Sequence, residues 1–209
     1  MMSEEMTKQG ILIQQAEVTA LTAWAQYYKN IMIPLIVAVV MFCGLLTSEY
    51  HKGTLINILT KGLSRWKVIA AKAISAVSIW TICYWLCFGI TYAYCIYFWD
   101  NTLTHYVGFA SFCIWLFGIL LIAIILWLSS FSTSSSLVLL GVSVALVGFY
   151  LLQMVPFLTD AVPVKLLSSG SLIDGSTDIS HFLPAVYVTI LLSMVLLILA
   201  AVQFNRKKF

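Results

Sequence analysis

The stretch HYVGFASFCIWLFGILLIAIILWL, residues 105–128, decides the fold class. It contains no Asp, Glu, Lys or Arg, and it is long enough to cross the hydrocarbon core of a bilayer as one helix. The whole chain has the same character, because 62% of its 209 residues are apolar, 9% are charged and its mean hydropathy is +1.01. Soluble domains carry about 25% charged residues. The composition therefore predicts a membrane protein and excludes a disordered chain, a secreted disulfide scaffold and a nucleic-acid-binding domain.

Four further stretches have the length and apolar composition of membrane-spanning helices. The sequence therefore predicts an all-α, polytopic bundle of five transmembrane helices, which forms one membrane domain over residues 31–209. The predicted spans, including the one quoted above, are residues 31–47, 73–99, 105–128, 137–155 and 182–204.

Residues 1–30 precede the first predicted span and form a separate segment. Residues 11–28 place apolar side chains on one face of a helix, whereas Gln14, Gln15 and Glu17 disfavour a complete span. We expect an amphipathic interfacial helix at the outer membrane surface. Residues 1–9 lack the basic start and long apolar core of a signal peptide. Two routes to the outside stay open: unaided translocation of a short tail, or a preceding helix that this chain does not carry.

The basic residues predict the orientation of the bundle. Eight of the eleven Lys and Arg residues lie in the first connection or after the last span, and none lies between residues 73 and 164. By the positive-inside rule, the first connection and the C-terminus are cytoplasmic. The connection 129–136 is then also cytoplasmic, and the segment 155–181 is external. The eight basic residues are Lys52, Lys61, Arg65, Lys67, Lys72, Arg206, Lys207 and Lys208.

Groups that could support catalysis or bind a metal are scattered through the sequence. The histidines His51, His105 and His181 lie in distant segments, and no Gly-rich phosphate-binding loop is present. Cys83 and Cys87 are one helical turn apart but have no neighbouring histidine or carboxylate, so packing explains them better than a metal site. We therefore expect no catalytic residues, no metal site and no cofactor, and we expect that the chain does not hydrolyse ATP by itself.

The first cytoplasmic connection has a helical pattern of its own. Thr54 can cap the start of a short helix, and Gly62 can end it in the left-handed conformation. Between them Leu55, Ile58 and Leu59 fall on one helical face. Periodicity alone allows two interpretations: a helix that lies on anionic headgroups, or a docking element for a cytoplasmic partner.

This connection resembles the loop that follows the second helix of ABC-2-type permeases, the membrane subunits of bacterial ABC exporters. The similar runs are Glu49-x-x-x-Gly53-Thr54-Leu55, the stretch from Leu59 to Lys67, and Ala71-Lys72. In that family the loop carries a short cytoplasmic coupling helix that inserts into the ATP-binding subunit. The resemblance thus implies a coupling role for Glu49, Gly53, Thr54, Leu55, Ile58, Leu59, Lys61 and Arg65.

The resemblance also implies a function. The chain would be the permease subunit of an ABC exporter in the bacterial plasma membrane, with an ATP-binding subunit, a second permease chain (identical or related) and membrane lipids as partners. Family members usually have six helices, and here residues 1–30 resemble only the end of the first external loop. The aromatic second span, with Trp80 and Tyr84, allows either simple packing or a wall for apolar or peptide-like cargo. The alternative function is a non-transporting scaffold or sensor whose basic loop binds lipid.

Overall fold

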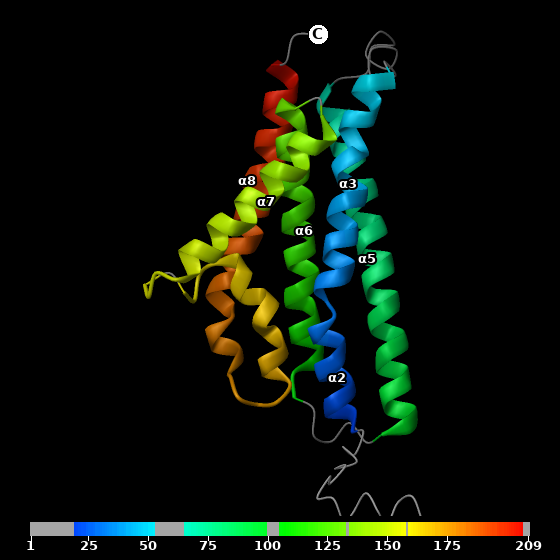
Figure 1. Ribbon diagram of the computed structural model, residues 1–209, viewed down its shortest axis with the longest axis vertical. Helices are drawn as coiled ribbons and strands as arrows, with labels where there is room; N and C mark the ends of the chain where they lie inside the picture. Colours follow the sequence, from blue (N-terminus) through cyan, green and yellow to red (C-terminus); the bar gives the residue numbers. More distant parts are fainter. Residues whose placement is uncertain (1–18, 53–64, 100–104, 133, 158, 207–209) are drawn as a thin grey trace, which may run out of the picture.

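The computed structural model describes residues 19–52, 65–99, 105–132, 134–157 and 159–206 of the chain. Five of its helical stretches are long and apolar enough to cross a membrane, and the described residues contain no strand. The predicted all-α, five-helix membrane bundle is confirmed (Figure 1). The elements are α2 (Ala20–Lys29), α3 (Met32–Lys52), α5 (Arg65–Phe98), α6 (Val107–Phe131), α7 (Ser135–Gln153), the 3-10 helices η2 (Pro163–Leu172) and η3 (Ile179–His181), and α8 (Leu183–Arg206).

Helix α6 is the centre of the bundle. It packs against α3, α5, α7, α8 and η2, and the run from Leu120 to Leu126 is buried throughout. A helix that is apolar on every side is suited to the centre of a bundle, where neighbouring helices cover all of its faces. The helices around α6 instead present large exposed apolar side chains, such as Ile82 and Leu140. This outer surface matches an environment of lipid chains rather than water.

The first two spans extend beyond their predicted limits. The first candidate span begins at Ala20 instead of residue 31, and the second begins at Trp66 instead of residue 73. Helices α2 and α3 are separated by only Asn30 and Ile31, and Figure 1 shows them running one after the other along the bundle. Pro34 explains the break, because it has no N–H to donate to the Asn30 carbonyl and its ring crowds that group. The Asn30 carbonyl accepts from Ile33 N instead, at 3.0 Å.

Helix α2 is the described part of residues 1–30, for which an interfacial helix is expected. Its axis follows the bundle rather than crossing it, and its residues Ala20, Trp24 and Tyr28 are buried at four-residue intervals (Figure 1). The Trp24 ring lies 5.6 Å from the Phe88 ring of α5. One apolar face therefore packs against the bundle. Residues 1–18, which carry the rest of the expected amphipathic segment, lie outside the described residues.

The described helix ends are divided between the two ends of the bundle as the charge pattern predicts. Figure 1 shows the end of α3, the start of α5, the α6–α7 connection and the end of α8 at one end of the bundle. The start of α2, the end of α5 and the start of α6 lie at the opposite end. The helix ends that lead into the basic first connection, the α6–α7 connection and the last described residues of α8 therefore share one side.

The segment between α7 and α8 packs against the half of α6 that lies far from the basic end. The Ser169 hydroxyl donates to the Ala110 carbonyl at 3.0 Å, and His105 N donates to the Ile173 carbonyl at 3.3 Å. Lys165 forms an ion pair with Asp160, and the hydrogen bond and charge of its ammonium group lower the pKa of the Asp160 carboxyl. Residues 162–173 of this segment are thus fastened to the bundle, whereas the turn directly after α7 extends to the side (Figure 1).

Candidate functional site

The coupling residues predicted from the sequence centre on the connection between α3 and α5. Glu49 belongs to the last turn of α3, and Arg65 is the first residue of α5. Both helices reach the connection at the same end of the bundle (Figure 1). The short coupling helix itself stays a prediction, because Gly53, Thr54, Leu55, Ile58, Leu59 and Lys61 lie outside the described residues.

The end of α3 that leads into this connection is attached to α7. Thr47 is fully buried, and its hydroxyl lies 2.5 Å from the hydroxyl of Ser135, the first residue of α7. Thr47 also donates to the Cys43 carbonyl at 3.2 Å. This buried contact joins the C-terminal part of α3 to the start of α7. The sequence pattern gave no indication of this contact, since the two hydroxyls come from segments 88 residues apart.

Helix α5, on the other side of the connection, is attached to α6 by its aromatic side chains. The Trp80 indole N–H donates to the Trp115 carbonyl at 3.0 Å, and the Trp115 indole N–H donates to the Thr81 hydroxyl at 3.1 Å. Farther along, the Tyr84 hydroxyl donates to the Ser111 carbonyl at 2.9 Å. Packing and hydrogen bonding thus account for the buried side of the aromatic second span.

Helix α2 joins the same network from the other side. The Tyr28 hydroxyl lies 2.7 Å from the Ser111 hydroxyl and donates to the Val107 carbonyl at 3.3 Å. The neighbouring Tyr27 lines the same groove as Tyr84 of α5. Three helices therefore meet at one buried set of hydroxyl groups, which fixes the distance between α2 and α5.

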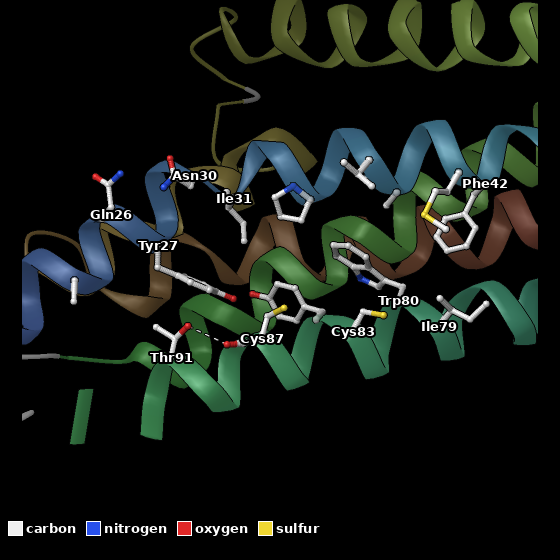
Figure 2. Close-up of a pocket in the computed structure, with 16 residues that line it drawn as sticks. Gln26, Tyr27, Asn30, Ile31, Phe42, Ile79, Trp80, Cys83, Cys87 and Thr91 are labelled. Carbon is white, nitrogen blue, oxygen red and sulfur yellow. Dashed lines mark hydrogen bonds between the residues drawn. The ribbon is translucent and has the colours of Figure 1, made fainter. Parts of the chain in front are cut away.

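A groove remains open between α2 and α3 on one side and α5 on the other (Figure 2). It encloses about 580 Å³, and Trp80 and Tyr84 lie along it. Sequence analysis identified these two aromatic residues but not the residues on α2 and α3. All of the described residues that line it are uncharged: Ala23, Gln26, Tyr27, Asn30, Ile31, Pro34, Val37, Ala38, Met41, Phe42, Ile79, Trp80, Cys83, Tyr84, Cys87 and Thr91.

Potential metal ligands do not gather in the part of the chain that the structure describes. There, no three His, Cys, Asp or Glu residues lie close enough to hold an ion. Cys83 and Cys87 are exposed and line the groove, whereas Cys43, Cys95 and Cys113 are buried.

Comparison with known proteins identifies the family. The family model described as "ABC-2 family transporter protein" matches residues 2–209, and this agrees with the resemblance of the first connection. No curated protein and no solved structure matches the chain. The family supports a membrane-spanning permease subunit that associates with a separate ATP-binding subunit. Because the match spans almost the whole chain, this protein belongs to the ABC-2 family of transporter proteins.

Proposed function

We propose that this permease belongs to an exporter of the bacterial plasma membrane and moves an apolar or peptide-like cargo. The observation that carries the proposal is the family match over residues 2–209, together with the basic connection between α3 and α5. A second permease chain, identical or related, would complete the membrane part of the transporter. ATP would be bound and hydrolysed by the separate subunit at the cytoplasmic side.

The connection between α3 and α5 would transmit the work of the ATP-binding subunit. In this proposal, residues 54–61 form the coupling helix, and Leu55, Ile58 and Leu59 fill an apolar groove on that subunit. Movement of the coupling helix would pull on the adjacent ends of α3 and α5. The Thr47–Ser135 contact supports this role, because it extends the coupling from α3 to α7.

Purification of the tagged chain from its native membranes in mild detergent tests the proposal. We expect a nucleotide-binding protein with a Gly-x-x-x-x-Gly-Lys-Ser/Thr motif in stoichiometric amount, and ATPase activity in the purified complex. A chain that binds anionic vesicles through its basic loop but never brings an ATPase with it would favour the scaffold or sensor function instead.

The proposed orientation predicts a labelling pattern. In a cysteine-free background, single cysteines at Ser171 and Asp178 should react with an impermeant maleimide added to intact cells. Asp178 is exposed and Ser171 half-buried in the segment between α7 and α8, so Asp178 should react faster. Cysteines at Lys61 and Ser134 should react only after the cells are opened. Reaction at Lys61 from outside would overturn the orientation, including the cytoplasmic C-terminus.

A further inference from the structure

The break between α2 and α3 divides one long helical run into two parts. Around it, the amides of Ile31 and Ile33 donate to carbonyls three residues back, at 3.3 and 3.0 Å, instead of four residues back as in an α-helix. Pro34 has no N–H with which to continue the α-helical bonding across the break. Short stretches of 3-10 bonding within a helix often mark a hinge, and sharp bends of helices occur at proline. The break is therefore a place where α3 can change its direction relative to α2.

Helix α2 is held firmly by its neighbours. Its Tyr28 hydroxyl lies 2.7 Å from the Ser111 hydroxyl of α6. A Cβ atom at Gly170 of η2 would lie 3.3 Å from the Tyr28 Cβ atom, so these two segments meet closely. Trp24 is fully buried, and its ring lies 5.6 Å from the Phe88 ring of α5. A tilt of α2 would break directional hydrogen bonds and displace buried rings, so α2 moves with α5, α6 and η2.

Helix α3 is attached to the bundle in a different way. It packs against α6 and α7, and its buried side chains Leu35, Val39 and Phe42 are apolar. Among the side chains of α3 that the structure describes, the hydrogen bond to another helix is that of Thr47, far from the break, with Ser135 of α7. Apolar packing is non-directional and tolerates small shifts of one helix along another. The end of α3 near the basic connection can therefore move while its start stays at the break.

The side of α3 that faces α5 is not packed against it along the groove (Figure 2). Val37 and Met41 line the groove opposite Ile79, yet Val37 is 50% exposed and Met41 66%. The distance between α3 and α5 can thus change without repacking of side chains between them. From Pro34 to Thr47, α3 is about 20 Å long, so a rotation of about 10° at the break moves Thr47 by about 3.5 Å.

We propose that the break at Asn30–Pro34 is a hinge about which α3 swings while α2 stays in place. Movement of the connection between α3 and α5 swings α3, carries the start of α7 with it through the Thr47–Ser135 contact, and changes the width of the groove. The driving force in this inference rests on the proposed coupling function. The hinge itself is a property of the permease and requires no ATP-binding subunit.

Distances between spin labels, measured by pulsed electron paramagnetic resonance on the full chain in nanodiscs, test the hinge. In a cysteine-free background, one pair of labels joins α3 to α8 through Val40 and Ile198. The reference pair joins α2 to α8 through Ala25 and Tyr187. All four positions are exposed, and α8 is a common reference because it packs against the central helix α6. We expect the distance distribution of the α3 pair to be at least twice as broad as that of the α2 pair.

Pro34→Ala restores a backbone N–H and lets α2 and α3 join into one continuous helix. Pro34 is exposed, so this change removes no core contact. We expect the distribution of the α3 pair to narrow to the width of the α2 pair. The matched control is Pro184→Ala, at an exposed proline in the first turn of α8. An N–H in that turn has no partner within the helix, so both widths should stay unchanged.

Two results would overturn the hinge: equal widths of the two pairs in the wild type, or an unchanged α3 pair in Pro34→Ala. ATP and vanadate, added to the complex with the co-purified ATPase, should shift the α3 pair by about 3.5 Å and the α2 pair by less than about 1 Å. Equal shifts of both pairs would also contradict the hinge. A broad α3 distribution without any co-purifying ATPase would remove the coupling role and leave the hinge. Equal widths in a complex with an active ATPase would remove the hinge and leave the coupling role.

Discussion

Ile58→Glu will leave the permease in the membrane but abolish co-purification of the ATP-binding subunit and cargo-stimulated ATP hydrolysis. Burial of an isoleucine side chain contributes on the order of 1.5–3 kcal/mol to docking. The glutamate loses this contribution and also brings a charge into an apolar groove, where it is desolvated without a partner. Pull-down of the ATP-binding subunit from detergent extracts, normalised to the amount of permease, measures the effect.

The matched control changes charge without changing apolar area. Lys61→Gln together with Lys67→Gln removes two exposed charges, each worth about 1 kcal/mol or less in a surface pair. These changes should weaken docking far less than Ile58→Glu. If the loop instead adheres to lipid, the lysine changes should weaken its binding to the membrane surface at least as much as Ile58→Glu does. Full ATPase binding by Ile58→Glu would remove the coupling role from residues 54–61.

The apolar composition of the chain made the bundle predictable, but not the limits of its helices. The span predicted at residues 105–128 corresponds to α6, Val107–Phe131. It could be predicted closely because this stretch is apolar on every face and has no competing interpretation. The span predicted at residues 73–99 is part of α5, which starts at Arg65. Lys67 and Lys72 end the apolar stretch but not the helix, since the backbone hydrogen bonds of a helix form equally well outside the hydrocarbon core.

The groove was less accessible to prediction than the coupling loop. The pattern of residues 54–61 can be recognised because Leu55, Ile58 and Leu59 recur at the spacing of one helical face. Helix α5 is apolar on all sides, so periodicity cannot separate Trp80, which is 5% exposed, from Ile82, which is 65% exposed. Helix α2 lies largely within the helix expected over residues 11–28. Gln14, Gln15 and Glu17 argued against a complete span there, so the first predicted span began at residue 31 instead of Ala20.

Gly118→Ala will destabilise the permease, because α5 and α6 meet closely at this glycine. A Cβ atom at position 118 would lie 2.2 Å from Trp80 Cε2 and 2.4 Å from Trp80 Nε1. The indole is buried and its N–H donates to the Trp115 carbonyl at 3.0 Å, so the ring cannot move without breaking that hydrogen bond. Overpacking of this kind typically costs about 1–3 kcal/mol.

Gly148→Ala is the matched control for this prediction, since a Cβ atom at that position of α7 has no neighbour within 4 Å. In the middle of a helix, alanine is favoured over glycine by about 1 kcal/mol. Gly148→Ala should therefore be neutral or stabilising, whereas Gly118→Ala should lower the midpoint of thermal unfolding in the same detergent by several degrees. Trp80→Phe, which removes the indole N–H and reduces the ring, should recover part of the stability lost in Gly118→Ala. Equal midpoints for Gly118→Ala and Gly148→Ala would contradict the close packing of α5 on α6, and with it the position of the wall that Trp80 and Tyr84 form in the groove.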